Sequence, residues 1–179
     1  SSAEKIIIHI SNFRKVKRVQ DVLNVFAKIN ESVPSKLLLI GDGPERLKME
    51  QLCRNLKLCD SVRFIGKLKA VEKVLSVSDL FLLPSATESF GLVALEAMAS
   101  KVAVISSNSG GLPEVNIDGK TGFLLDVKDV DAMGEKAINL LQNPELLETF
   151  KQNAFRHAMK FDLPNILPLY EEIYQQLSK

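Results

Sequence analysis

Residues 80–99 read LFLLPSATESFGLVALEAMA and join a short apolar run to a helical pattern through a polar loop. The run from Leu80 to Leu83 is continuous, which predicts a strand buried on both faces. The segment that begins near Phe90 predicts a helix. A buried strand followed by a helix is the repeating unit of parallel α/β sheets.

The same alternation extends in both directions along the chain. Amphipathic helical patterns, with apolar residues at i, i+3, i+4 and i+7, begin at Val19 and at Met49. Because parallel neighbours need a crossover helix, this order predicts an α/β fold, a Rossmann-like doubly wound parallel sheet of about six strands with helices on both faces. The predicted strands are Lys5–Ser11, Lys36–Ile40, Val62–Ile65, Leu80–Leu83, Val102–Ser106 and Phe123–Leu125.

Three helical segments follow Leu125, over residues 130–142, 145–161 and 166–177. No linker or repeat divides the chain, so we expect residues 1–179 to form a single domain. The last helix, within residues 164–179, has an apolar stripe that needs a surface to cover, so we expect fraying or self-association there. The stripe comprises Ile166, Leu169, Tyr170, Ile173 and Leu177.

Composition excludes several classes of function. The 179 residues include 23 Lys plus Arg against 22 Asp plus Glu, so the chain lacks the strongly basic surface of a general nucleic-acid binder. No apolar run approaches the ~20 residues of a membrane span, and the first residues are not a charged-then-apolar signal segment. We expect a cytoplasmic protein in which Cys53 and Cys59 are reduced packing thiols, because their spacing fits neither a zinc site nor a redox pair.

Two loops place polar side chains where a doubly wound sheet binds its ligand. Ligands lie beyond the carboxyl ends of the strands, where strand order reverses, which here means between the loops after the first and fourth strands. The first loop, Ser11–Arg18, has four cations just before a predicted helix. The helix dipole disfavours cations at this end, and a bound anion would offset that cost. We predict phosphate recognition by Lys17 or Arg14. A solvated helix start is the alternative.

The second loop ends at Ser89, Phe90 and Gly91, where the helix begins. The first backbone N–H groups of a helix are unpaired, and Gly91 has no side chain to keep a phosphate away from them. This predicts an anion site. Ser89 as a plain N-cap is the alternative, and the two interpretations are compatible.

Glu96 is the residue of this helix that we single out first. It shares a helical stripe with Leu92, Leu95 and Ala99, so we expect a carboxylate buried near the sheet and in need of partners. The adjacent hydroxyls of a ribose would satisfy it, and so would an internal cation or backbone amides. The residues alone leave both possibilities open.

Three further features give weaker signals. The turn Gly41-Asp42-Gly43-Pro44 lacks the dinucleotide fingerprint, and we expect Pro44 to be the first residue of a helix. The segment Ser109–Glu114 predicts a permissive loop or a substrate contact. His9 is expected to be a satisfied core histidine, and His157 a helix-surface residue.

Together these motifs resemble the retaining glycosyltransferases of family 4. The run from Glu88 to Glu96 is similar to their E-x7-E motif, and the other motifs follow in the family's order. These are a turn with a downstream lysine (Ser11 to Lys17), GDGP (Gly41 to Pro44), V-x-F-x-G (Val62 to Gly66), GGxPE (Gly110 to Glu114) and DGxTGFL (Asp118 to Leu124). The resemblance covers residues 5–125. It implies the carboxy-terminal, nucleotide-sugar-binding half of a two-domain GT-B enzyme, whose final helix crosses to the amino-terminal domain.

The resemblance also implies a role for each matched residue. Glu96 would hold the ribose hydroxyls, Glu88 would contact the donor sugar, and Lys17 would neutralise the leaving group. Amides around Phe90 would hold the diphosphate, and residues 64–67 would line the base pocket. The implied substrate-binding residues are Ser11, Asn12, Arg14, Gly41, Phe64, Gly66, Lys67, Ser89, Phe90, Gly91, Leu92 and Glu96, and the catalytic ones are Lys17 and Glu88.

Asn12 departs from the family, which usually has an arginine at this position, and Arg14 would supply the missing cation. The strings Ser11–Arg18 and Ser78–Ser85 are similar to a subgroup of the family that acts in bacillithiol biosynthesis. This implies UDP-N-acetylglucosamine as donor and L-malate as the small-molecule acceptor, which the amino-terminal domain would bind. No metal or other cofactor is implied, since cations and helix dipoles stabilise the leaving diphosphate in this fold.

Other functions fit the same residues. The chain would be a non-catalytic nucleotide-sugar-binding module if no acceptor half acts with it. It would also fit a family 4 transferase with another donor and acceptor, in polysaccharide or glycolipid synthesis, or an epimerase of the same fold. Glycoside hydrolysis is disfavoured, because it needs two carboxylates about 5 Å apart and Glu96 is assigned to the ribose.

Overall fold

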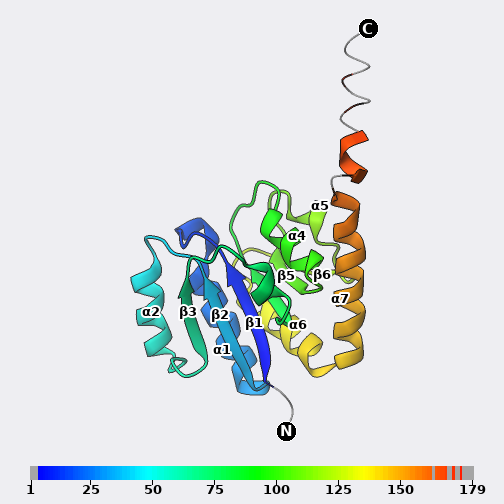
Figure 1. The fold of residues 1–179 in the computed structure, drawn as a ribbon. Coiled ribbons are helices and arrows are strands. Elements are labelled where there is room, and N and C mark those ends of the chain that lie inside the picture. Colours follow the sequence, from blue (N-terminus) through cyan, green and yellow to red (C-terminus); the bar gives the residue numbers. More distant parts are fainter. Residues whose placement is uncertain (1–3, 163, 169–170, 172–173, 175–179) are drawn as a thin grey trace.

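The computed structural model describes residues 4–162, 164–168, 171 and 174. Within them, six strands form one parallel sheet in the order β3-β2-β1-β4-β5-β6 (Figure 1), which confirms the predicted fold class. The strands are β1 (Lys5–Ile10), β2 (Ser35–Ile40), β3 (Val62–Gly66), β4 (Leu80–Leu83), β5 (Ala103–Ser107) and β6 (Gly122–Leu125).

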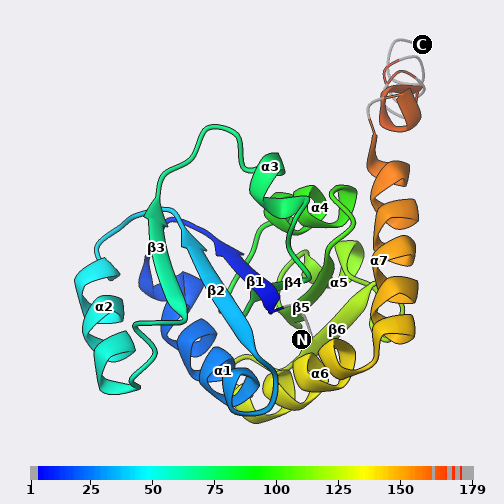
Figure 2. The same ribbon diagram turned by 60° about the horizontal axis from the view of Figure 1, so that its bottom comes forward.

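Helices cover both faces of the sheet (Figure 2). One face is covered by α1 (Val19–Ser32), α2 (Arg46–Asn55) and α6 (Val130–Gln142), and the other by α3 (Glu72–Leu75), α4 (Leu92–Ala99) and α5 (Leu112–Val115). The helix α7 (Pro144–Ala158) lies on the β6 side and contacts both α4 and α6. Two short 3-10 turns complete the elements, η1 (Lys15–Lys17) and η2 (Met159–Phe161).

Alternate strand residues build two hydrophobic cores, one on each face. Ile7 and Leu37 pack toward α1, whereas Ile8 and Phe81 pack toward α4, and all four are fully buried. Burial of each such side chain contributes roughly 1.5–3 kcal/mol. Since both faces are covered, β4 is apolar throughout and all four of its residues are buried, as its sequence predicts.

Several boundaries and side chains differ from the sequence-based expectations. Pro44 belongs to a turn, and α2 begins at Arg46. The helix predicted to end at Phe161 gives way at Met159 to the tighter turn η2. Both cysteines are free thiols. Cys53 is buried, as expected for a packing thiol, whereas Cys59 is exposed.

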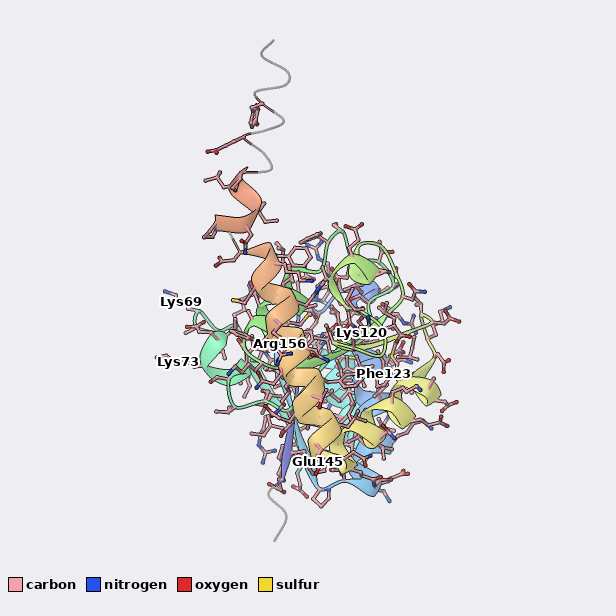
Figure 3. All side chains as sticks on the ribbon, turned by 90° about the vertical axis from the view of Figure 1, so that its right-hand side faces the viewer. Lys69, Lys73, Lys120, Phe123, Glu145 and Arg156 are labelled. Atoms are coloured by element: carbon pink, nitrogen blue, oxygen red, sulfur yellow. The ribbon has the colours of Figure 1, made fainter. Side chains whose placement is uncertain are left out.

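The helix α7 has charges that suit its dipole. Glu145 lies in its first turn and Arg156 in its last, and Figure 3 labels both side chains along the helix. The helical residues 164–168 project beyond its end, away from the sheet (Figure 1). Of the predicted terminal stripe, Ile166 is partly buried, and the other four residues lie outside the described ones, so the role of residues 164–179 stays a prediction. None of the described helices is both long and apolar enough for a membrane span.

Candidate functional site

The two polar loops singled out in the sequence meet where the strand order reverses. β1 and β4 are hydrogen-bonded neighbours, with Ile8 opposite Phe81, so the loops that follow them start side by side. The amide of Ala86 in one loop donates to the carbonyl of Val16 in the other, at 2.8 Å. The two loops therefore meet at the edge of the sheet where the sequence predicts that a ligand binds.

Lys17 and Glu88, the two residues expected to be catalytic, form an ion pair across this junction. The Nζ atom of Lys17 lies 2.6 Å from Oε1 of Glu88, and the hydroxyl of Ser85 donates to the same oxygen at 2.8 Å. The side chains of Glu88 and Lys17 are 10% and 21% exposed. Sequence reasoning missed Ser85, which is fully buried and orients the carboxylate. Within the described contacts the second oxygen of Glu88 has no partner, so it is able to accept from a ligand hydroxyl.

The segment 107–111 supports the loop that contains Glu88. The amide of Gly111 donates to the Glu88 carbonyl at 3.0 Å, and the Ser109 hydroxyl donates to the Ala86 carbonyl at 2.6 Å. Gly110 has φ +58°, and a Cβ atom there would lie 1.9 Å from the Glu88 carbonyl oxygen. A glycine is required at this position because a residue with a side chain would not fit. These contacts indicate that the segment holds the Glu88 loop in place.

The amino end of α4 presents free backbone N–H groups at the same junction. Gly91 is the N-cap, with φ 92°, and no side chain caps the helix, so the alternative of Ser89 as N-cap is wrong. Among the described contacts, the amides of Phe90, Gly91 and Leu92 donate to no other group. Such groups attract anions. The Phe90 ring is 36% exposed and meets Phe161 edge to face, with ring centroids 5.9 Å apart.

Glu96 lies on the opposite face of α4 from the one we expected, since the structure exposes it. The face that packs on the sheet consists of Ala94, Ala97 and Met98, whereas Leu92 is 66% exposed. Because nearly every residue of α4 is apolar, the pattern did not identify its buried side, and the small alanines pack closely. No ion pair of Glu96 occurs among the described residues. Its carboxylate is therefore accessible, which a ribose-binding role also requires.

The remaining cations of the first loop lie apart from the ion pair. Asn12 and Arg14 are exposed, and Arg14 lines a cavity of about 290 Å³ together with Lys15 and Arg18. Neither Lys17 nor Glu88 lines this cavity. Replacement of the missing family arginine by Arg14 stays a prediction.

The ends of β1, β2 and β3 lie next to one another at this edge of the sheet. The amide of Gly41 donates to the Gly66 carbonyl at 2.8 Å, and a Cβ atom on Gly41, whose φ is +122°, would lie 1.8 Å from the Ser11 carbonyl oxygen. Lys67 is exposed just beyond Gly66. Phe64 packs on the α2 side and lines a cavity of about 160 Å³ with Cys53 and Val62, so its place in a base pocket stays a prediction.

The two histidines differ in burial. His9 is fully buried and fully hydrogen-bonded, which confirms a satisfied core histidine, and burial lowers its pKa to about 4. Its second partner is Ser11, a contact that the sequence did not reveal. His157 is half-buried against Phe161, with ring centroids 5.3 Å apart, and is not the plain surface residue that we expected. Burial lowers its pKa as well.

The fold and this junction define a class of protein. Residues 1–157 match the family described as Glycosyl transferases group 1, and the chain belongs to that family. It is 50% identical over 175 residues to N-acetyl-alpha-D-glucosaminyl L-malate synthase of Bacillus anthracis, a match that covers 97% of this chain and 46% of that protein. It is 30% identical to D-inositol 3-phosphate glycosyltransferase of Corynebacterium urealyticum, over 97% of this chain and 43% of that protein.

Solved glycosyltransferase structures have the same fold. Sucrose-phosphate synthase from Thermosynechococcus elongatus superposes with a TM-score of 0.89 at 29% identity, over 99% of this chain and 46% of that one. A mutant of S. aureus TarM, in complex with fondaparinux, alpha-GlcNAc-glycerol and UDP, superposes with a TM-score of 0.88 at 25% identity, over 96% of this chain and 35% of that one. The chain spans about half the length of the curated relatives it matches, so its architecture is that of one Rossmann-like domain of a GT-B glycosyltransferase.

Proposed function

We propose that this chain is the carboxy-terminal, donor-binding half of a retaining glycosyltransferase that transfers N-acetylglucosamine from UDP to a hydroxyl of L-malate. The observation that carries the proposal is the Lys17–Glu88 ion pair beside the free amides of α4, at the point where the strand order reverses. The 50% identity to a relative named for this donor and acceptor supports the choice of substrates.

In this proposal the diphosphate lies between Lys17 and the amino end of α4. The bond between the anomeric carbon and the β-phosphate oxygen breaks, and its electron pair stays on that oxygen. Lys17 and the amides of Phe90, Gly91 and Leu92 stabilise the growing negative charge, because they are fixed donors beside it. The acceptor hydroxyl bonds to the anomeric carbon on the same face, and its proton passes to the departing phosphate oxygen.

Each carboxylate has a separate task. The free oxygen of Glu88 accepts a hydrogen bond from a sugar hydroxyl, while its other oxygen stays on Lys17 and Ser85. The exposed Glu96 accepts from the ribose hydroxyls. Because Lys17 and the amides meet the phosphate charge, we propose that no metal or other cofactor is needed. Transfer by the assembled enzyme should therefore continue in EDTA, and restoration by Mg²⁺ of an activity lost in EDTA would contradict this.

A competition titration tests the donor. UDP-N-acetylglucosamine, UDP-glucose, GDP-mannose and NAD are titrated into this chain by calorimetry, and each is then used to displace bound UDP. We expect UDP-N-acetylglucosamine to bind most tightly and NAD not to compete. Equal binding of GDP-mannose, or no binding of any uridine nucleotide, would contradict the proposal.

The alternative is a nucleotide-sugar-binding module without catalysis. The same junction of Lys17, Glu88 and the free α4 amides would also bind a nucleotide sugar without transferring it. Addition of the remaining half of that relative to this chain, with UDP-N-acetylglucosamine and L-malate, separates the two functions. Product formation supports the transferase, whereas donor binding without transfer to any acceptor supports the module. Conversion of the sugar without an acceptor would indicate an epimerase.

A further inference from the structure

His9 and Ser11 form a hydrogen-bonded pair at the carboxyl end of β1, where the first polar loop begins. The Nδ1 atom of His9 lies 2.8 Å from the Leu82 carbonyl oxygen, and its Nε2 atom lies 2.8 Å from the Ser11 hydroxyl oxygen. The ring is fully buried between Phe13 and Phe81, with centroids 6.4 Å from each. The imidazole therefore has one fixed orientation and one fixed pair of partners.

The chemistry of the partners assigns the protons. A carbonyl oxygen only accepts, so Nδ1 of His9 must be the protonated nitrogen. The ring is neutral, because burial disfavours its charged form and lowers its pKa to about 4. The charges of the Lys17–Glu88 pair oppose each other, since Lys17 lowers this pKa and Glu88 raises it. A neutral ring protonated on Nδ1 has a lone pair on Nε2. The Ser11 hydroxyl must therefore donate its proton to His9.

This hydrogen bond determines which ligand groups Ser11 is able to bind. Its only proton is donated to His9, so the oxygen of this partly buried residue has only lone pairs left for a ligand. An unprotonated phosphate oxygen also presents only lone pairs, and two acceptors facing each other repel. A hydroxyl or an amide N–H, by contrast, pairs with this oxygen.

We infer that His9 is a positioning residue that makes the Ser11 hydroxyl a hydrogen-bond acceptor only, so that Ser11 recognises a hydroxyl or N–H group of the nucleotide sugar and not a phosphate oxygen. The inference rests on the proposed function for the presence of that ligand. It changes the sequence-based expectation for this loop, in which Ser11 belongs to an anion-binding segment. Lys17 and the α4 amides remain the phosphate donors, and Ser11 adds selection for the sugar or ribose.

The protonation of His9 is tested on the free chain by long-range ¹H–¹⁵N correlation spectra at neutral pH. We expect a protonated Nδ1 and an unprotonated Nε2, and Ser11→Ala should shift the Nε2 resonance of His9 while that of His157 stays unchanged. A ring protonated on Nε2, or an imidazolium at neutral pH, would overturn the inference. Because no ligand is present, this result does not depend on the proposed function.

The choice of ligand group is tested with two probes, UDP-N-acetylglucosamine and inorganic pyrophosphate, which has acceptor oxygens but no sugar. Loss of one hydrogen bond corresponds to about a 5–10-fold change in affinity. Ser11→Ala should weaken UDP-N-acetylglucosamine by about this factor and leave pyrophosphate unchanged or tighter, whereas Lys17→Ala should weaken both. Equal losses for the two probes in Ser11→Ala would overturn the inference.

A second variant tests His9 itself. His9→Phe keeps an aromatic ring in the core and returns the Ser11 proton, so pyrophosphate should bind a few-fold tighter and UDP-N-acetylglucosamine more weakly. Unchanged binding of both probes would contradict the role of His9. If this variant does not fold, Ser11→Ala and the spectra of the unmodified chain still decide the question. Failure of the unmodified chain to bind either probe would instead contradict the proposed function.

Discussion

The stability of the chain should fall between pH 7.5 and pH 5, and His9 should be a main cause. Its pKa is lowered from 6.5 in the unfolded chain to about 4 in the fold, so the unfolded state binds a proton first and stability is lost as pH falls. At pH 5 about 30 unfolded chains are protonated at His9 for each one that is not, whereas in the fold the ratio is about 1 to 10. The resulting difference is about 2 kcal/mol, against almost none at pH 7.5.

Urea unfolding of the unmodified chain and of His9→Gln at pH 7.5, 6 and 5 measures this difference. His9→Gln should lower stability at pH 7.5 but remove about 2 kcal/mol of the pH dependence. His157→Gln is the control, because this second histidine also has a pKa lowered by burial but is only half-buried, so it should remove less of the slope. An identical slope in His9→Gln and in the unmodified chain would refute the neutral, buried His9.

Two substitutions test the two sides of the site. Glu96→Gln should weaken UDP binding about 10-fold in calorimetry and leave the urea midpoint unchanged, because Glu96 is exposed. The exposed Glu135 on α6 gives the matched control, Glu135→Gln. If Glu96→Gln binds UDP as tightly as the unmodified chain, Glu96 does not bind the ribose. Gly110→Ala should lower the free energy of unfolding by about 3 kcal/mol or more in thermal unfolding, because φ is +58° and the new Cβ would meet the Glu88 carbonyl. Gly119→Ala is the control: φ is +68° there but the space around it is open, so it should lower the free energy of unfolding by about 1 kcal/mol. Equal costs for the two alanines would contradict the supporting role of segment 107–111.

The sequence was sufficient for the central strands β4 and β5 because strands buried on both faces have a continuous run of buried residues. Leu80–Leu83 is an example, since no turn residue interrupts it and helices cover both sides. The position of the site followed from the same argument, because parallel strands bring the loops after β1 and β4 to one edge. Lys17 and Glu88 meet there although 71 residues separate them.

The pattern of apolar residues did not predict which face of α4 is buried or which groups the buried polar side chains contact. Almost all of α4 is apolar, so its buried side depends on where small residues let it approach the sheet, and Glu96 was assigned to the wrong face. The His9–Ser11 contact depends on side-chain direction within a strand end, and Ser85 was hidden because a serine beside a loop has many possible partners. These are properties of the packed structure and not of the residue types.

Calorimetric titration of UDP and uridine into the unmodified chain and into Lys17→Ala tests the central claim most directly. Because Lys17→Ala leaves the Glu88 carboxylate unpaired, Glu88→Gln, which keeps the cation, is titrated beside it. If Lys17 and the amino end of α4 grip the diphosphate, Lys17→Ala loses at least about 10-fold in UDP affinity and little in uridine affinity, while Glu88→Gln retains UDP. Equal losses for UDP and uridine in Lys17→Ala, or UDP affinity that does not depend on Lys17, would contradict it.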